Sequence, residues 1–397
     1  MDSKECLDNQ KERVLMVHNY YQIGGGEHTV FENEQRLLRE HGHYVKTYTR
    51  DNKELNSSIW KKMLLPFTTV YSFKTYREVK KLIKSENIDV VHCHNTFPLI
   101  SPSVYYAAWK CGVPVIQTIH NFRLLCANGI FLRDGNVCED CLTHGLKCGI
   151  KHKCYRNSKI QTIVLTNMLR IHRRLGTYKK LNCIFLSEFN KSKFAHILEN
   201  GKGQQFIKPN FEYISNKINP GPRDGSYVFV GILVKYKGID FLVDNWTLDK
   251  DLYIFGSGEL EEHVKEACRK NPYIHYMGFQ SHETVCEYIG KAEALVFPSE
   301  CYEGFPMVLI EAFAFGTPVI CSDLGNGASI VTKEKAGVTF PRRDKEGLLQ
   351  AVKNVSENFE NFSSNAKEAY DSRYVPDYNY QQLKRIYEAV VNETGQS

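Results

Sequence analysis

The chain has 397 residues, of which 42% are hydrophobic and 12% aromatic, and a formal net charge of +6. This length and composition predict two domains with large cores and exclude a disordered chain. The polar N-terminus runs straight into an apolar segment, and no stretch of about 18 apolar residues follows. We therefore expect a cytoplasmic protein with no signal peptide or spanning helix, whose thirteen cysteines stay reduced.

The charge is divided unevenly along the chain. Residues 1–209 hold 32 Lys and Arg against 18 Asp and Glu, a net +14, whereas residues 210–375 hold 17 against 24, a net −7. Basic side chains alternate with apolar ones in residues 60–84 and 151–180, and the second of these segments has nine basic residues and no acidic one. Such a mixture suits a helix that lies on an anionic membrane, although a solvated amphipathic helix of the domain explains any one such segment slightly better. Nucleic acid is not an expected partner, because no recognition motif accompanies the charge.

The first predicted elements form the start of a βαβ unit. Residues 13–20 predict a strand, 27–41 a helix and 45–49 a second strand. The turn between the first strand and the helix is a glycine triplet, Gly24, Gly25 and Gly26. Glycines at this turn are typical of a phosphate-binding loop, although a tight turn explains them equally well.

Three histidines lie near the ends of the next two predicted strands. The strand over 89–93 contains His92 and is followed by His94, and the strand over 113–119 is followed by His120. Ligands of open α/β sheets bind beyond the carboxyl ends of the strands. A single histidine there is more often structural than catalytic, but three together indicate that one lines a site.

Five of the thirteen cysteines lie in the insert 126–154, which interrupts the alternation of strands and helices. Cys138 and Cys141 form a CxxC knuckle suited to a soft metal, and Cys126 and Cys154 could complete a tetrahedral site. Other donors in the insert that could take their place are Cys148, His144 and His152. Four thiolates leave no open position on Zn²⁺, so the predicted site is structural; a metal-free loop or a redox pair remains an alternative.

A second set of alternating elements begins after a polar linker at 207–225. Short apolar strands are predicted at residues 227–230, 252–255, 275–279 and 294–297. Two such sets predict two Rossmann-like domains that face each other across a cleft. The predicted boundaries are 1–209, 210–375 and a C-terminal helix in 376–397.

The most informative stretch is 296–319, VFPSECYEGFPMVLIEAFAFGTPV. It predicts strand, loop, helix and strand, with Glu303 in the loop and Glu311 in an otherwise apolar helix. A buried carboxylate is costly unless something pairs with it. The amides of 304–308 at the helix start offer a site for phosphate.

These segments resemble a known enzyme family. YVFVGILVKYKGID, YIFGSGEL, IHYMGF and the stretch through ICSDLGNGASIV are similar to the retaining glycosyltransferases of family four, the group 1 type with the GT-B fold. VVHCHN and TIHNFR extend the likeness into the first domain, and HNFRLLC…CEDC…KCYRNS resembles bacterial enzymes of surface-polysaccharide assembly. The resemblance implies a nucleoside diphosphate sugar donor on the second domain and a saccharide acceptor on the first, and the two basic segments favour an acceptor linked to a lipid. It also implies that the last helix, about 378–391, crosses back to the first domain.

The resemblance also implies roles for single residues. Glu311 matches the glutamate that binds the donor ribose, Glu303 the one near the transferred sugar, and Lys237 the lysine on the diphosphate. His120 matches a histidine near the reacting sugar. The remaining implied donor contacts are Gly231, Gly304, Phe305, Pro306, Val308 and Leu309.

One residue departs from the family pattern. Ile232 stands where the family usually has an arginine that shares the diphosphate with the lysine, so the leaving group depends on Lys237, the helix amides and either Lys235 or another basic residue. The resemblance implies hexosyl transfer with retention and without a cofactor. We also expect no metal for transfer, and the two basic segments favour a peripheral position at the inner face of the plasma membrane. Ile232 keeps an alternative open, a non-catalytic sugar-nucleotide-binding subunit of a polysaccharide assembly complex. A Rossmann oxidoreductase is disfavoured, because the glycine triplet does not supply the GxGxxG pattern.

Overall fold

The computed structural model describes residues 11–21, 25–57 and 59–394. The chain divides into two compact units, each built on a parallel sheet with Rossmann-like alternation of strands and helices, as predicted. The first unit runs through Gly129, continues over Asp140–Pro209 and ends with the chain from Asn379. The second unit contains Asn210–Tyr378 and also Ile130–Glu139, a segment that the sequence had grouped with the first domain.

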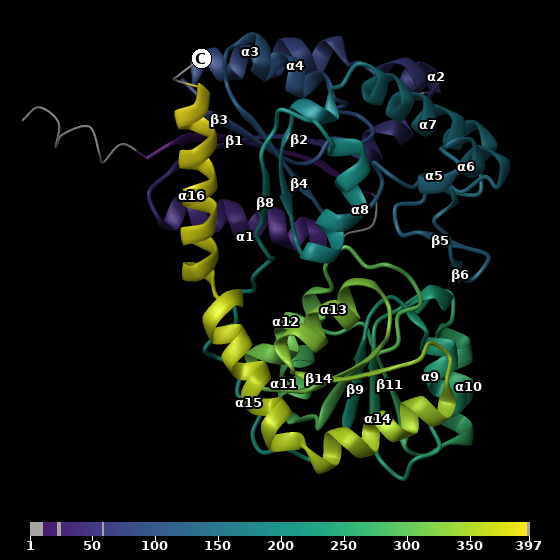
Figure 1. Ribbon diagram of the computed structural model, residues 1–397. Coiled ribbons are helices and arrows are strands. Elements are labelled where there is room, and N and C mark those ends of the chain that lie inside the picture. The colour runs from purple at the N-terminus through teal and green to yellow at the C-terminus, as the bar shows by residue number, and fades with distance from the viewer. Residues whose placement is uncertain (1–10, 22–24, 58, 395–397) are drawn as a thin grey trace, which may run out of the picture. The chain divides into compact units, whose positions relative to one another are not determined.

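The sheet of the first unit has the strand order β2-β1-β3-β4-β7-β8, with all pairs parallel (Figure 1). Its strands are β1 (Arg13–Tyr20), β2 (Tyr44–Asp51), β3 (Val90–Asn95), β4 (Val115–Ile119), β7 (Asn182–Phe185) and β8 (Gln205–Ile207). Its helices are α1 (Gly26–Glu40), α2 (Ile59–Thr68), α3 (Phe73–Ser85), α4 (Ser103–Lys110), α5 (Asp140–Thr143), α6 (Lys147–Lys151), α7 (Lys159–Arg174) and α8 (Glu188–Leu198), together with α16 (Pro376–Thr394) from Asn379 onward.

Two predicted elements of this unit differ in extent. β3 is buried along its whole length and continues to Asn95, so His94 lies in the strand and not in a loop. The amphipathic segment 60–84 forms two helices, because Ser72 starts α3 by accepting a hydrogen bond from the Thr75 amide at 3.2 Å.

The last helix, α16, packs on the sheet of the first unit, which confirms that the chain returns to it. Leu383, Ile386 and Val390 join Val14 and other strand residues in one hydrophobic core. β1, which contains Val14, is buried at every position except its two ends, as is typical of a strand in a parallel sheet that is covered on both faces.

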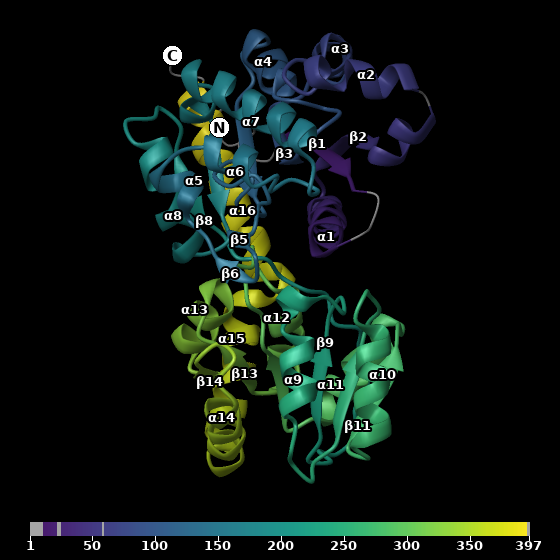
Figure 2. The ribbon, with the colours of Figure 1, turned by 90° about the vertical axis from the view of Figure 1, so that its right-hand side faces the viewer.

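The second unit has the strand order β11-β10-β9-β12-β13-β14, again all parallel; Figure 2 shows β14, β13, β9 and β11 in this order from left to right. Its strands are β9 (Tyr227–Val230), β10 (Leu252–Phe255), β11 (Ile274–Gly278), β12 (Ala294–Phe297), β13 (Val319–Ser322) and β14 (Gly337–Phe340). Its helices are α9 (Ile239–Asn245), α10 (Glu261–Lys270), α11 (His282–Lys291), α12 (Met307–Ala314), α13 (Gly325–Glu334), α14 (Lys345–Glu357) and α15 (Phe359–Ala369).

Alternate residues of each strand of this sheet enter different cores. Val228 packs with α11, α12, α13 and α15, whereas its neighbours Tyr227 and Phe229 pack with α9, α10 and α14. Successive side chains of a strand point to opposite faces of the sheet, so α12 lies on one face and α9, α10 and α14 lie on the other.

The segment Ile130–Glu139 forms a short antiparallel hairpin, β5 (Leu132–Arg133) and β6 (Asn136–Val137). Arg342 donates hydrogen bonds to the Gly135 carbonyl and to Asn136 Oδ1, both at 2.9 Å. The amide of Tyr302 donates to the Ile130 carbonyl at 3.3 Å. These contacts explain why the hairpin belongs to the second unit.

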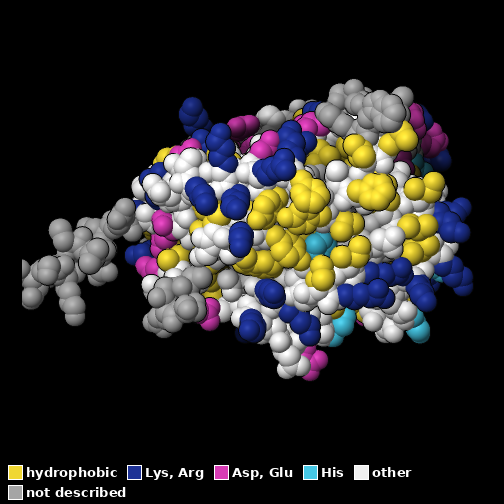
Figure 3. All heavy atoms as spheres, turned by 90° about the horizontal axis from the view of Figure 1, so that it is seen from above, with side chains coloured by type: hydrophobic (Ala, Val, Ile, Leu, Met, Phe, Trp, Pro, Cys, Tyr) yellow, Lys and Arg dark blue, Asp and Glu magenta, His cyan; other side chains and the backbone are white. Residues whose placement is uncertain are grey.

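The helices α2, α3 and α7 of the first unit expose large apolar side chains, and Figure 3, which looks onto these helices, shows apolar side chains flanked by Lys and Arg. Phe67 is 74% exposed. The other exposed apolar residues are Met63, Leu64, Phe73, Ile160, Ile171 and Leu175, and we call the set of seven the apolar face. Within the described residues, no helix has both the length and the apolar character needed to cross a bilayer.

Arg223 anchors the entry of the second unit to the end of α12. Its guanidinium donates to the carbonyls of Ala292 (2.6 Å), Phe315 (2.6 Å) and Gly316 (3.0 Å), and to Thr317 Oγ1 (2.7 Å). One side chain thus satisfies carbonyls that the helix itself leaves unpaired.

We predict that Arg223→Ala removes protection of the α12 and β13 amides in hydrogen–deuterium exchange and destabilises the second unit by about 2–3 kcal/mol, because several carbonyls lose a charged donor. The matched control is Arg269→Ala, which removes an exposed pair with Glu266 and is expected to change stability by less than about 1 kcal/mol. Equal exchange in the two variants would contradict the anchoring role.

Candidate functional site

Lys237 and Glu303 form the centre of a polar site in the second unit. Lys237 Nζ lies 2.6 Å from Glu303 Oε1, and Ser299 Oγ donates to the same oxygen at 2.8 Å. Lys237 ends a short 3₁₀ helix after β9, and Glu303 lies in the loop after β12. Both loops follow the carboxyl ends of neighbouring strands, which is where ligands bind in such sheets.

Gly238 explains how the two loops come so close. Its φ is +72°, and a Cβ at this position would lie 2.1 Å from the Pro298 carbonyl oxygen. Only glycine accepts both the left-handed backbone and the close approach. The loop that carries Lys237 therefore packs directly on the loop that leads to Glu303.

The charge of the pair is maintained in its largely buried setting. Burial disfavours the ammonium, but the Glu303 carboxylate outweighs this and raises the pKa of Lys237. A fixed cation next to a carboxylate gives the site one group for an anion and one for a hydroxyl.

The loop between Glu303 and α12 contains the predicted donor contacts. Asn326 Nδ2 donates to the Glu303 carbonyl at 2.8 Å and also to the Gly304 carbonyl, which holds the loop against α13. Pro306 is the N-cap of α12 and has an extended backbone. The structure places Gly304, Phe305 and Pro306 in this loop, directly before the helix.

Val308 and Leu309 lie in the first turn of α12, so their side chains are placed by the helix and not by the loop. The Leu309 side chain is buried in the core, its amide donates to the Pro306 carbonyl at 3.2 Å, and Val308 packs against the same core. Leu309 can therefore meet a ligand only through its backbone, whereas the side chain of Val308 is half-buried.

Glu311 lies further along α12, with a neighbour that the sequence did not indicate. His282 Nε2, at the start of α11, is 3.7 Å from Glu311 Oε1 and 3.5 Å from Cys286 Sγ. The Cys286 thiol and the Glu311 carboxylate raise the pKa of His282. The carboxylate that the sequence leaves unpaired thus has a cationic neighbour.

Gly231 and Ile232 follow β9. The Gly231 amide donates to the Phe255 carbonyl at 3.0 Å, and the Ile232 side chain is 44% exposed.

The triplet Asp249–Asp251 has the Asp-x-Asp spacing of a metal motif, but it precedes β10 and so lies at the opposite end of the sheet. Asp251 there accepts a hydrogen bond from His275 at 2.7 Å.

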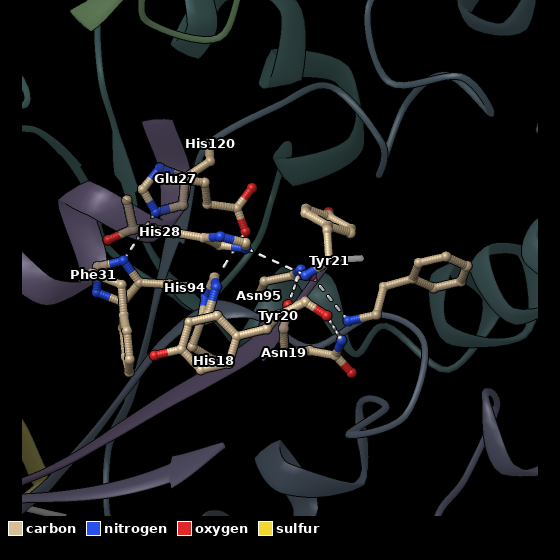
Figure 4. Close-up of polar contacts among 12 residues, drawn as sticks. His18, Asn19, Tyr20, Tyr21, Glu27, His28, Phe31, His94, Asn95 and His120 are labelled. Carbon is tan, nitrogen blue, oxygen red and sulfur yellow. Dashed lines mark hydrogen bonds and ion pairs between the residues drawn. The ribbon is translucent and has the colours of Figure 1, made fainter. Parts of the chain in front are cut away.

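A second polar cluster lies in the first unit, where His120 follows β4. His120, His94, Asn95 and Arg123 line a cavity of about 60 Å³. His94 Nδ1 and His120 Nε2 are 2.9 Å apart, and Figure 4 shows the two rings next to Glu27 and His18. Burial and the neighbouring His94 hold the pKa of His120 well below its usual range.

Behind His94 lies a fully buried ion pair between Lys208 and Glu34. Lys208 Nζ is 2.6 Å from Glu34 Oε1, and Glu34 Oε2 is 3.2 Å from His94 Nε2. Burial works against the charged carboxyl, but Lys208 and His94 outweigh it and hold the pKa of Glu34 well below its usual range. This buried network was not predicted from the sequence.

Glu27 is a further site residue that the sequence did not single out. It follows the glycine triplet in the first turn of α1, and Asn121 Nδ2 donates to its Oε2 at 3.4 Å. Burial raises the pKa of Glu27 to about 8, although Arg123 and Asn121 act in the opposite direction. Of the triplet, Gly25 caps α1 and Gly26 begins it, whereas Gly24 lies outside the described residues.

A pattern in α1 could have revealed Glu34. The buried positions Val30, Phe31, Glu34 and Leu38 share one face of the helix, so the carboxylate stands among core residues. Lys208 gave no such signal, because it lies in a segment that is typical of a linker.

The predicted zinc ligands divide between the units, since Cys138 belongs to the second and the others to the first. Cys126 and Cys141 are close enough to interact, and this contact lowers the pKa of Cys141 to about 6. Within the described ranges, the one group of three or more donors at metal spacing is Glu34, His92 and His94. The cysteine zinc site stays a prediction.

Comparisons with known proteins extend over both units. Residues 225–358 match the family described as glycosyl transferases group 1, and residues 23–136 match glycosyltransferase family 4. An uncharacterized glycosyltransferase of Methanocaldococcus jannaschii is 26% identical over 371 residues, covering 88% of this chain and 93% of that protein.

Solved structures show the same fold. Sucrose-phosphate synthase from Thermosynechococcus elongatus has a TM-score of 0.67 at 17% identity, covering 96% of this chain and 100% of that one. HepE from Anabaena, solved in complex with UDP, has a TM-score of 0.63 at 14% identity, covering 95% and 100%. The two family matches together span more than half of the chain, and with the pair of parallel-sheet units they show that this protein is a glycosyltransferase of family four, group 1, with the GT-B fold.

Proposed function

We propose that this glycosyltransferase moves a hexosyl group from a nucleoside diphosphate sugar to a hydroxyl of a saccharide acceptor, with retention at the anomeric carbon. The Lys237–Glu303 pair next to the start of α12 is the observation that carries the proposal. A buried cation can hold the diphosphate, and the adjacent carboxylate can accept a hydroxyl of the sugar. HepE, which shares the fold, was solved with UDP, and this supports a nucleotide donor.

Different residues bind different parts of the donor. Lys237 and the backbone of Gly304–Leu309 hold the diphosphate, Gly231 lets the backbone approach it, and Glu303 orients the sugar. Glu311 binds the ribose hydroxyls, with His282 as a second polar group at 3.7 Å. A diol satisfies a carboxylate that is set in an apolar helix.

The proposed reaction proceeds on one face of the sugar. The bond from the anomeric carbon to the diphosphate oxygen breaks while the acceptor oxygen bonds to the same carbon, and the departing phosphate oxygen takes the acceptor proton. Stabilisation of the leaving group then carries most of the catalysis, without a divalent metal. Because Ile232 offers no charge, this stabilisation depends on Lys237 and the backbone amides.

The acceptor is proposed to be lipid-linked and to be reached at the inner face of the plasma membrane, where the protein binds peripherally. The apolar face on α2, α3 and α7 supports this proposal, because apolar side chains next to Lys and Arg match an anionic bilayer. A cavity of about 130 Å³ lined by Leu65, Pro66, Ile160 and Val164 opens between α2 and α7.

A second candidate function is a non-catalytic subunit that binds the sugar nucleotide within a polysaccharide assembly complex. The exposed Ile232 favours it, since the leaving group has one cation fewer than the family pattern provides. Turnover separates the two functions, because only the enzyme releases free nucleoside diphosphate.

Donor binding is tested with a panel of UDP-, GDP- and dTDP-sugars. We expect one nucleotide class to raise the melting temperature, and Glu311→Ala to reduce this shift and raise the donor KM about tenfold or more, because two ribose hydrogen bonds to a carboxylate are lost. Glu283→Ala, a change at an exposed position of α11, serves as the control. An unchanged KM in Glu311→Ala would remove this residue from the ribose site.

Catalysis is tested by Lys237→Ala and Glu303→Gln, measured as release of the nucleoside diphosphate. Loss of the cation should lower kcat about 10²–10³-fold, since a charged contact to the leaving group is strongest in the transition state. Lys333→Ala, a change at an exposed lysine of α13, is the control. Turnover abolished by EDTA while the fold is retained would contradict metal-independent transfer, and no turnover with tight donor binding would favour the non-catalytic subunit.

Membrane binding is tested by flotation with vesicles of phosphatidylglycerol and phosphatidylcholine. We expect binding to anionic vesicles that weakens with salt, and a loss of about tenfold or more in the double variant Phe67→Asp/Ile160→Asp, because two exposed apolar side chains become charged. Phe279→Asp changes a side chain of the second unit that is 84% exposed and is the matched control. Equal loss in the two variants would argue against the apolar face.

A further inference from the structure

We propose that Glu34 and Lys208 are positioning residues that hold His120 in one tautomer through His94, with the proton on Nε2 and the lone pair of Nδ1 kept for a substrate hydroxyl. The inference rests on the proposed function and on the place near the reacting sugar that the family resemblance implies for His120. It assigns a purpose to a buried ion pair whose two residues do not themselves line the cavity.

The contacts form a continuous chain of three steps. Lys208 Nζ is 2.6 Å from Glu34 Oε1, Glu34 Oε2 is 3.2 Å from His94 Nε2, and His94 Nδ1 is 2.9 Å from His120 Nε2. Glu34 and Lys208 are fully buried, and His94 is nearly so.

The carboxylate decides where His94 carries its proton. An ionised carboxylate only accepts hydrogen bonds, so a neutral His94 is most stable with its proton on Nε2, which faces Glu34. Within the described part of the chain, Glu34 Oε2 and His94 Nε2 are both buried without a hydrogen-bond partner, and they lie 3.2 Å from each other. Their mutual approach is therefore the interaction open to both atoms.

The choice at His94 then decides the tautomer of His120. With its proton on Nε2, His94 has only a lone pair at Nδ1, so His120 must donate from Nε2. A neutral His120 is left with an unprotonated Nδ1. That atom can accept a hydrogen bond from a sugar hydroxyl in the cavity that the ring lines.

Lys208 keeps the Glu34 carboxylate ionised. Its Nζ also lies 2.9 Å from Asn379 Oδ1, which leaves the ammonium directed at Glu34. Without this charge, a carboxyl in a fully buried place would take up a proton and could donate to His94 instead of accepting. The tautomer of both histidines would then be free to invert.

The other polar groups around Glu34 do not replace this chain. His92 Nδ1 lies 3.7 Å from Glu34 Oε2, but it is hydrogen-bonded to Tyr387 OH at 2.8 Å. His92 Nε2 is bonded to Thr118 Oγ1 at 2.7 Å, and burial lowers the pKa of His92 to about 3. His92 is thus a neutral histidine whose two nitrogens are both occupied by hydroxyls.

The same residues have the spacing of a metal site, since one ligand atom each of Glu34, His92 and His94 lies within 4.8 Å of the others. The Lys208 ammonium, however, already neutralises the carboxylate at 2.6 Å. A dication in this place would be repelled at close range in a water-excluded setting. The geometry therefore favours a proton-ordering network over a metal ligand set.

The direct test is NMR of the full chain labelled with ¹⁵N-histidine, in which two-bond couplings distinguish the tautomers. We expect His120, assigned with His120→Asn, to carry its proton on Nε2 in the unmodified protein. In Glu34→Gln we expect the proton on Nδ1, because the amide can donate to His94 Nε2 and reverse the chain. A proton on Nδ1 in the unmodified protein would overturn the inference, and so would a divalent ion that binds the protein but not Glu34→Gln.

Turnover gives the second readout. Glu34→Gln and Lys208→Met should lower kcat about 10–100-fold and leave the donor-induced thermal shift unchanged, and Lys208→Arg should restore much of the loss. The matched control is Glu12→Gln, which removes another carboxylate close to a buried histidine, 3.5 Å from His43 Nδ1. An inverted tautomer with unchanged turnover would refute the proposed role of His120 and leave the positioning intact. An unchanged tautomer in Glu34→Gln would refute the positioning itself.

Discussion

The ion pair between Lys208 and Glu34 is the interaction on which the first unit depends most. Two charges taken out of water are tolerated only when each is paired and hydrogen-bonded, and both conditions are met here. The pair joins α1 to the residue that follows β8 and, through Asn379, to α16. A single buried ammonium thus connects a helix, the edge of the sheet and the returning C-terminal helix, and it fixes the carboxylate that faces His94.

In the second unit, the comparable constraint is the close packing of two loops. Gly238 lets the turn after β9 lie on the Pro298 carbonyl, and Asn326 ties the loop after β12 to α13. Lys237 and Glu303 are consequently held in place before any ligand arrives. Preorganised charge of this kind does not need to be rearranged when a leaving group develops negative charge, which is what group transfer from a diphosphate requires.

The parts of the fold with strong local signals could be predicted from the sequence. The apolar strands at 13–20 and 227–230 and the helix after Pro306 are local features. The resemblance of 227–240 and 296–319 to the family indicated Lys237, Glu303 and Glu311 as site residues. Contacts between distant segments could not be predicted. His282 lies near Glu311 but belongs to the neighbouring helix α11, and Lys208 is fully buried although its segment is typical of a linker. The single helix expected over 60–84 is two helices, since the cap at Ser72 competes with continuation.

Asn379 Nδ2 donates to the Pro209 carbonyl at 2.6 Å, so the two residues at which the chain leaves and re-enters the first unit are hydrogen-bonded to each other. Residues 210–378 are therefore, in topological terms, an insertion whose two ends meet. Such an insertion can be exchanged as one block through two adjacent junctions, without altering the sheet that receives it. The hairpin Ile130–Glu139 is the part that an exchanged block would have to match, because Arg342 holds its turn. Modularity of this kind offers a route by which the same first unit can be combined with different second units.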